Sequence, residues 1–287
     1  MKDDRTTPAR RALLRGTALL GLAATAGCFG TDRARTPATS GVSGSPSASG
    51  GPAGGSQAAK PLNPSTYRLQ PLTGYGPVTR APEKPSVRKA PILQLNGAGR
   101  GMVLTFDDGP DADYTPHILK TLRRYKVRAM FFVCGEQVGM NDDLLREMAD
   151  EGHVIGNHTW THPLLTTLSR SSIRSEISRT SDIVEKTIGE RPLWFRAPYG
   201  AWNRNVFQIG ADLGMEPLAW TVDTVDWETP GTAAITRAVV QGAGPGVIVL
   251  SHDAGGNRSQ TVEALRTWLP KLIDEGYDLT LPRRRDV

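Results

Sequence analysis

The chain lacks the features that mark several specialised classes of protein. Its 287 residues include only two cysteines, Cys28 and Cys134, which excludes a fold built on disulfide bonds. Its longest apolar run, from Gly16 to Gly27, is shorter than the roughly 20 residues that a helix needs to cross a bilayer, so the sequence predicts no membrane-spanning helix. Large apolar side chains are nearly absent from residues 30–60, which excludes a packed domain there because nothing offsets the entropy of ordering.

Basic charge is concentrated in the first third of the chain. Residues 1–94 contain 13 Lys and Arg against 4 Asp and Glu, whereas residues 95–287 contain 21 against 25. A nucleic-acid-binding protein normally carries its basic charge on the folded domain, so we expect no nucleic-acid partner. The second range is long enough for one domain with its own core.

The first 28 residues resemble the export signal of a bacterial lipoprotein. The pair Arg10-Arg11 resembles a twin-arginine signature, and the apolar run after it ends in small residues before Cys28. Thr25 stands where Leu is commonest in such signals, so cleavage by an ordinary signal peptidase is the alternative. We expect residues 1–28 to be a signal peptide, Cys28 to be lipidated, and the chain to be either held at the outer face of the cytoplasmic membrane or secreted.

Residues 29–94 are predicted to be a flexible linker rich in Gly, Ser and Pro. The part from 61 to 94 keeps many prolines but adds larger side chains such as Tyr75 and Leu93. Both a linker and an arm packed on the domain are compatible with that composition. Residues 95–287 then form the folded domain.

Short apolar runs alternate with helical patterns from residue 101 onward. Runs such as 101–106 and 246–250 predict buried strands, and apolar residues at helical spacing predict helices such as 115–125 and 172–188. About seven strands and six helices alternate, which favours parallel strands joined by crossover helices. An open doubly wound sheet and a barrel both fit. We favour an α/β barrel-like fold, because no Gly-rich phosphate turn follows the first strand and polar clusters follow the strand ends.

Five polar motifs follow predicted strands. Asp107 and Asp108 are adjacent on an extended segment, so their side chains diverge and can serve a proton and a metal separately. His158 and His162 are four residues apart, so on a helical turn they would share one face and could chelate one ion. Each motif alone has a structural explanation, but reactive residue types at successive strand ends are not expected from structure alone. The motifs are TFDDG at 105–109, HTWTH at 158–162, RAPYG at 196–200, DTVDW at 223–227 and LSH at 250–252.

Taken together and in this order, the five motifs resemble the polysaccharide deacetylase family, also called the NodB homology domain or carbohydrate esterase family 4. The resemblance covers residues 105–252 directly and about 95–285 with the flanking strand and helix pattern. It implies a distorted (β/α)7 barrel with a divalent metal, Zn²⁺ first, with Co²⁺ or Mn²⁺ as alternatives. The implied metal ligands are Asp108, His158 and His162.

The resemblance also implies a catalytic pair. Asp107 would be the general base, held ionised and oriented by Arg196. His252 would be the general acid that protonates the leaving nitrogen, and Asp226 would favour its cationic form.

The remaining implied residues form the substrate site. The backbone N–H of Tyr199 would stabilise the oxyanion, and Trp227 and Leu250 would line the slot for the acetyl methyl group. The expected protein is a monomer that removes N-acetyl groups from a β-1,4-linked amino sugar polymer, of the peptidoglycan or chitin type. The alternatives are an O-acetyl xylan esterase of the same family and a glycan-binding module without activity.

Two other features resemble catalytic groups but have simpler explanations. The run Ser251-His252-Asp253 looks like a triad, yet consecutive residues at a strand end point to alternate faces. Cys134 is expected to be a small core residue rather than a nucleophile. His117 and His153 are expected to be structural.

Overall fold

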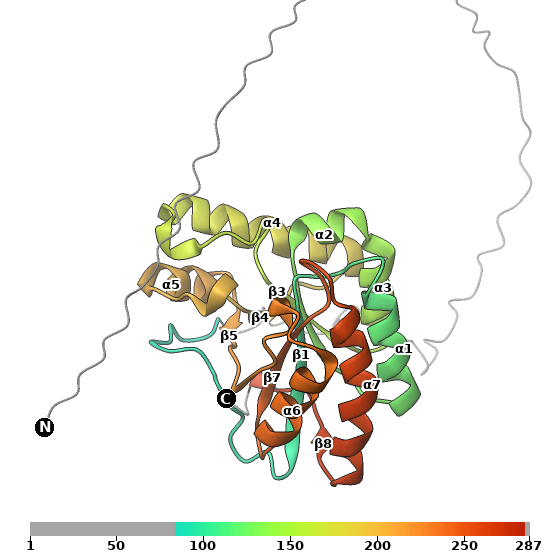
Figure 1. Ribbon diagram of the computed structural model, residues 1–287. Helices are drawn as coiled ribbons and strands as arrows, with labels where there is room; N and C mark the ends of the chain where they lie inside the picture. Colours follow the sequence, from blue (N-terminus) through green and yellow to red (C-terminus); the bar gives the residue numbers. More distant parts are fainter. Residues whose placement is uncertain (1–83, 285–287) are drawn as a thin grey trace, which may run out of the picture. The chain divides into compact units, whose positions relative to one another are not determined.

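The computed structural model describes residues 84–284, so the predicted signal peptide and most of the predicted linker lie outside the described residues. Eight strands, all paired in parallel, form one curled sheet whose order is β5-β4-β3-β2-β1-β7-β6, with β8 beside the start of β1 (Figure 1). Within this range no helix combines the length and the apolar character needed to span a bilayer. The strands are β1 Gly101–Asp107, β2 Met130–Val133, β3 Val154–Asn157, β4 Trp194–Phe195, β5 Glu216–Pro217, β6 Val222–Asp223, β7 Ile248–His252 and β8 Asp278–Leu279.

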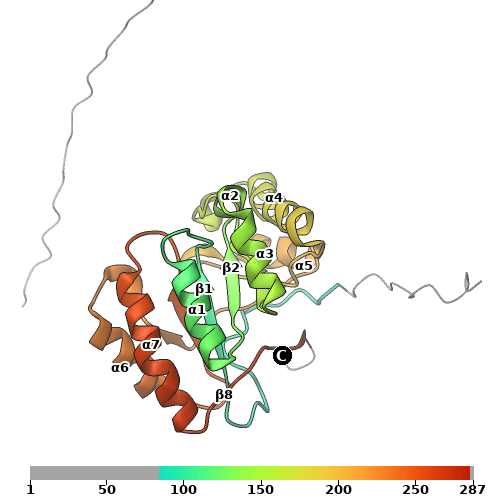
Figure 2. The same cartoon turned by 90° about the vertical axis from the view of Figure 1, so that its right-hand side faces the viewer.

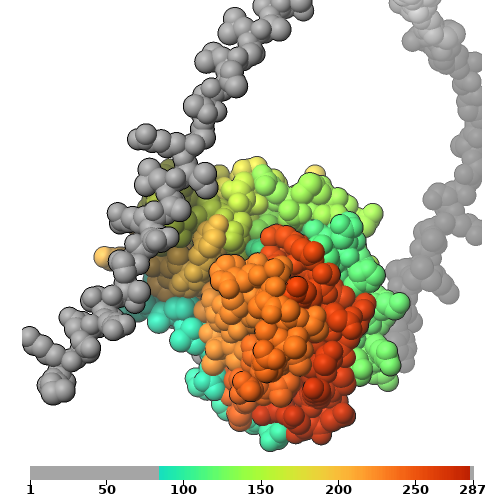
Figure 3. Space-filling view, in the orientation of Figure 1, coloured from blue at the N-terminus to red at the C-terminus, as the bar shows by residue number. Residues whose placement is uncertain are grey.

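Helices cover the outer side of the sheet. Helices α7, α1 and α3 lie side by side in one layer over β1 and β2 (Figure 2). Helix α6 packs next to α7, and together they form one continuous face in the space-filling view (Figure 3). The α-helices are α1 Thr115–Tyr125, α2 Gly135–Met140, α3 Asp142–Asp150, α4 Arg170–Ile188, α5 Arg204–Asp212, α6 Thr232–Gly242 and α7 Ser259–Asp274, with short 3₁₀ turns η1 Leu165–Thr167, η2 Pro198–Gly200 and η3 Asp226–Glu228.

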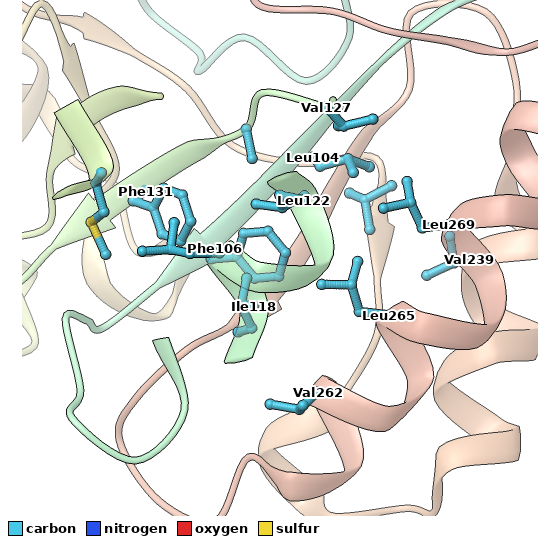
Figure 4. Close-up of a cluster of buried hydrophobic side chains, with 14 of the residues drawn as sticks. Leu104, Phe106, Ile118, Leu122, Val127, Phe131, Val239, Val262, Leu265 and Leu269 are labelled. Atoms are coloured by element: carbon cyan, nitrogen blue, oxygen red, sulfur yellow. The ribbon is translucent and has the colours of Figure 1, made fainter. Parts of the chain in front are cut away.

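Strand β1 is buried along its whole length and fixes which way Asp107 points. Leu104 and Phe106 face the helices and pack among side chains of α1 and α7, including Leu122 and Leu265 (Figure 4). Val103 belongs to a second apolar cluster on the opposite, inner side of the sheet. Because side chains alternate along a strand, Asp107 shares the inner side with Val103. The first catalytic candidate therefore sits at the rigid end of a central strand and faces the inside of the barrel.

A segment upstream of residue 95 lies between the two edges of the curled sheet. The N–H of Ile92 donates to the carbonyl of Pro217, and the N–H of Leu95 donates to the carbonyl of Gly246. Ile92 is 7% exposed and belongs to the inner apolar cluster. The last residues before position 95 thus pack on the domain.

The predicted α/β architecture is confirmed, with local differences. The described residues contain eight strands and seven α-helices where the sequence predicts about seven and six, and residues 216–223 supply two short strands at opposite edges of the sheet, β5 and β6. The chain pairs with β4 up to Leu218 and then crosses to β7, where the N–H of Thr221 donates to the carbonyl of Ile248. The run of residues 217–221 therefore crosses from one edge of the curled sheet to the other. The pattern of apolar residues alone does not reveal this crossing.

Candidate active site

The carboxyl ends of β1, β3, β4, β6 and β7 surround one cavity of about 620 Å³. This is the end of a parallel barrel at which catalytic residues are normally found. Arg196 and Asp226 lie behind its wall, each hydrogen-bonded to a residue that lines it. The predicted residues that line the cavity are Asp107, Asp108, His158, His162, Tyr199, Trp227, Leu250 and His252.

Arg196 holds the Asp107 carboxylate from behind. Its Nη1 donates to Asp107 Oδ1 at 2.6 Å, and both side chains are almost fully buried. The rest of the guanidinium donates to the carbonyls of Leu218 and Ala219, which fixes its plane. Burial raises the pKa of Asp107 above its ordinary value, while the charges of Arg196 and His252 act in the opposite direction. The carboxylate is therefore oriented and partnered on one oxygen, as a positioned base requires.

Three side chains bring metal-binding atoms together beside Asp107. Asp108 Oδ1 lies 3.6 Å from His158 Nε2 and 3.4 Å from His162 Nε2. Ligand atoms held about 2.1 Å from a tetrahedral zinc ion lie about 3.4 Å apart, so the spacing fits. Asp108 Oδ1 is buried and accepts no hydrogen bond from the described residues, so a metal ion coordinated by this oxygen would satisfy it.

The donor chemistry at His158 also fits a metal ion. Its Nδ1 donates to the carbonyl oxygen of Arg196 at 2.8 Å, which leaves the Nε2 lone pair directed toward Asp108. Burial lowers the pKa of His158 to about 3, so the ring is neutral at physiological pH. A neutral imidazole is the form that binds metals.

The prediction that the two histidines share a helical turn is wrong. Residues 158–162 form an irregular loop between β3 and η1, and two of them, Thr159 and His162, have φ angles of 73° and 57°. The rings nevertheless converge, with centroids 4.9 Å apart. The two histidines that the spacing singles out are therefore brought together by an irregular loop and not by a helical turn.

On the other side of the cavity, His252 is paired with Asp226. His252 Nδ1 lies 2.6 Å from Asp226 Oδ1, and the His252 N–H donates to Asp226 Oδ2. The hydroxyl of Thr261 donates to the same Oδ2 at 2.7 Å. Burial by itself lowers the pKa of His252, but the hydrogen bond to Asp226 and the charge of Asp226 outweigh it and raise the pKa to about 9. The imidazole is therefore cationic at neutral pH and can donate a proton.

The predicted substrate residues form the rim and one wall. Tyr199 and Trp227 are 67% and 53% exposed, although both line the cavity. The ring of Tyr199 packs edge-on against His162, with centroids 4.7 Å apart. Leu250 is buried at 4% exposure and offers an apolar wall deeper inside. Exposed aromatic faces around an entrance suit the apolar faces of sugar rings.

Comparison with known proteins decides the family. Residues 95–218 match the family model for polysaccharide deacetylase. The chain is 36% identical over 209 residues to a chitooligosaccharide deacetylase of Rhizobium leguminosarum bv. trifolii, which covers 69% of this chain and 97% of that relative. The chain belongs to the polysaccharide deacetylase family.

Two further polysaccharide deacetylases are similar to it. The peptidoglycan-N-acetylglucosamine deacetylase PgdA of Listeria monocytogenes is 38% identical over 194 residues, covering 68% of this chain and 40% of the relative, so this chain spans less than half the length of PgdA. The crystal structure of the Bc1960 peptidoglycan N-acetylglucosamine deacetylase superposes with a TM-score of 0.64 at 34% identity, covering 67% of this chain and 90% of that one. The predicted family and the barrel of the (β/α)7 type are confirmed.

Two features expected to be structural show no catalytic arrangement in the described structure. The carboxylate of Asp253 accepts from the hydroxyl of Thr115 at 2.5 Å, while the ring of His252 pairs with Asp226, so the three residues from Ser251 to Asp253 do not form a triad. Cys134 is 5% exposed, and burial raises its thiol pKa well above the usual value, which disfavours a thiolate nucleophile.

Several residues that hold the side chains of the candidate site were not predicted. Thr261 belongs to helix α7 and holds Asp226, and Arg258 just before that helix donates to the backbone carbonyl of Asp226 at 3.2 Å. Thr115 at the start of α1 holds Asp253, which lies against the turn at Gly109. These residues carry no motif, because a polar residue at the start of a helix is equally expected as a structural one.

Proposed function

We propose that this protein is a metal-dependent hydrolase that removes N-acetyl groups from a β-1,4-linked amino sugar polymer, of the peptidoglycan or chitin type. One observation carries the proposal. A base held by an arginine and an acid held by a carboxylate face the same cavity, with three metal-binding atoms beside the base. Amide hydrolysis needs both proton transfers, since an amine leaves only when it is protonated.

The metal site would consist of Asp108, His158 and His162. Two neutral nitrogens and one carboxylate oxygen are a donor set of the catalytic zinc type, which leaves positions open for water and substrate. A divalent ion bound there would lower the pKa of a water molecule and polarise the acetyl carbonyl. We propose Zn²⁺ as the bound ion, ahead of Co²⁺ and Mn²⁺.

Asp107 and His252 would then divide the proton transfers. Asp107, held by Arg196 on Oδ1, takes a proton from the attacking water as the water oxygen bonds to the acetyl carbon. His252, kept cationic by Asp226, donates its proton to the amide nitrogen as the carbon–nitrogen bond breaks. The products are acetate and the free amine of the sugar.

The substrate residues would bind the acetyl group and the sugar ring. The backbone N–H of Tyr199 would donate to the carbonyl oxygen as negative charge develops on it. Leu250 and Trp227 would enclose the methyl group, and the exposed faces of Tyr199 and Trp227 would contact the sugar. The chitooligosaccharide and peptidoglycan deacetylases among its relatives support a substrate of this kind.

The experiment is an acetate-release assay over purified polymers with metal content measured in parallel. We expect release from N-acetylglucosamine oligomers or peptidoglycan, loss of release with a chelator, and recovery with Zn²⁺. Release only from acetylated xylan would support the esterase alternative. Binding of these glycans with no acetate release from any of them would support the non-catalytic module and overturn the proposal.

We also propose that the enzyme acts outside the cytoplasm, anchored through a lipid on Cys28. The proposal rests on the twin-arginine-like pair Arg10-Arg11 and on the small residues that precede Cys28. Membrane fractionation of cells expressing the full chain tests it, with Cys28→Ala as the variant. We expect the parent in the membrane fraction and the variant in the soluble exported fraction, and equal distribution of the two would contradict anchoring at Cys28.

A further inference from the structure

The loop that carries two of the proposed metal ligands has an unusual backbone. Thr159 and His162 have φ angles of 73° and 57°, in the left-handed region that residues other than glycine rarely adopt. Thr159 is β-branched, which makes this conformation still less favourable for it. Such a conformation persists only where neighbouring groups hold it. The contacts of this loop therefore identify the residues that keep His158 and His162 in place.

Glu176 in helix α4 holds the middle of this loop. Its Oε2 accepts hydrogen bonds from the backbone N–H groups of Trp160 and Thr161, both at 2.9 Å, and its Oε1 accepts from the hydroxyl of Thr161 at 3.2 Å. Two successive N–H groups directed at one oxygen form an anion-binding concavity. Hydrogen bonds to a carboxylate are stronger than those between neutral groups.

The next residue of α4 holds the start of the same loop. The carbonyl of Ile177 accepts from Asn157 Nδ2 at 2.7 Å, and Asn157 Oδ1 accepts from the N–H of Thr159 at 2.8 Å. The N–H of His162 donates to Thr159 Oγ1 at 3.2 Å. One turn of α4 thus fixes both halves of the loop, and the position of His162 depends on the peptides that Glu176 binds.

Helix α2 holds the other side of the loop. The N–H groups of Gly135 and Glu136 donate to the carbonyls of Thr159 and Trp160, at 3.0 and 3.2 Å. These bonds leave the N–H groups of Trp160 and Thr161 free, and among the described residues Glu176 is the group that accepts from them. Water could satisfy these N–H groups if Glu176 were absent, but it would not fix where they point.

We propose that Glu176 is a positioning residue that sets the place of His162 relative to Asp108 and thereby the affinity for the metal ion. This inference rests on the metal site of the proposed function. The His162 Nε2 to Asp108 Oδ1 separation of 3.4 Å depends on the two peptides that precede and follow Trp160, and the N–H groups of both donate to Glu176 Oε2. Groups that orient metal ligands typically change metal affinity by about 10-fold to 100-fold when they are removed.

The test measures Zn²⁺ affinity of the full chain by competition with a chromophoric chelator. Glu176→Ala removes the acceptor, Glu176→Gln keeps its reach without the charge, and Glu176→Asp keeps the charge but shortens the reach. Glu185→Ala is the matched control, because Glu185 lies on the same helix and pairs with Arg191 at 2.8 Å, away from the loop. Melting temperatures of the metal-free variants and the d–d absorption of their Co²⁺ forms are recorded alongside.

We expect Zn²⁺ binding about 10-fold to 100-fold weaker in Glu176→Ala and in Glu176→Asp, largely recovered in Glu176→Gln, and unchanged in Glu185→Ala. The Co²⁺ spectrum should change in the Ala and Asp variants. Should the Ala variant fail to fold, the comparison of Gln with Asp decides, since both keep a polar side chain at this half-buried position. Parent-like Zn²⁺ affinity in the Ala or Asp variant would overturn the positioning role alone, whereas a parent that binds no metal would overturn the proposed function with it.

Discussion

Replacing Asp226 by Asn should move the alkaline limit of activity without destroying the site. The carboxylate of Asp226 pairs with His252 Nδ1 at 2.6 Å and, with its charge, raises the pKa of His252 to about 9 against the effect of burial. Asparagine keeps the shape and one acceptor but loses the charge, so burial should bring the pKa to its ordinary value of about 6.5 or below. His252 acts in its protonated form, so activity is lost as the pH rises through this pKa.

The magnitude follows from the protonated fractions. At pH 8 a group with a pKa of about 9 is about 90% protonated, and a group with a pKa of 6.5 is about 3% protonated. The kcat of Asp226→Asn at pH 8 should therefore be about 30-fold below that of the parent. At pH 6 the two proteins should agree within about twofold. The assay is the pH dependence of kcat for acetate release from an N-acetylglucosamine oligomer. Glu228→Gln, an exposed acid in the same 3₁₀ turn, is the control for a general charge effect. An alkaline limb at the same pH in parent and Asp226→Asn would refute the assignment of His252 as the acid.

Three further outcomes test the remaining parts of the site. Asp107→Asn should retain bound Zn²⁺ but release acetate about 10²-fold to 10⁴-fold more slowly, and parent-like rates would show that the base lies elsewhere. His162→Ala should lose most of its Zn²⁺ affinity in a chelator competition, and unchanged affinity would remove it from the donor set. Arg196→Met should lower the free energy of unfolding in urea by about 3–5 kcal/mol because it leaves the buried Asp107 carboxylate without its cation. Arg123→Met removes an exposed arginine that pairs with Glu147 and Glu151, so it should lower the free energy of unfolding far less than Arg196→Met, and equal costs for the two would contradict the burial argument.

The positions of the chemical groups could be predicted because they depend on few residues. A buried strand such as 101–106 is recognisable from its mainly apolar run, and a parallel sheet brings the carboxyl ends of its strands to one edge. Any polar motif directly after such a strand is then placed at the site without knowledge of the rest of the fold. Asp107, His158 and His252 are all of this kind.

The parts that could not be predicted depend on tertiary contacts instead. Residues 158–162 form no helical turn, and two of their N–H groups donate instead to Glu176, which lies 15 or more residues further along the chain. Glu176 itself belongs to an amphipathic helix in which a half-buried acid has no distinguishing pattern. The same holds for Thr261, which holds Asp226 from helix α7. Sequence motifs therefore indicated the groups that we propose to react, while the residues that hold them in place emerged only with the fold.

The two histidines that line opposite sides of the cavity show how the fold assigns different chemistry to one residue type. Each uses Nδ1 to contact an oxygen, but His158 contacts the backbone carbonyl of Arg196 and His252 contacts the carboxylate of Asp226. Burial lowers the pKa of the first to about 3, whereas the carboxylate reverses that effect for the second and raises its pKa to about 9. One ring is thus held neutral and suited to a metal ion, and the other is held cationic and suited to a leaving nitrogen. The charge state of each ring depends on the partner of its Nδ1. Removing the charge in Asp226→Asn should therefore convert His252 into a second neutral imidazole while leaving the metal site intact.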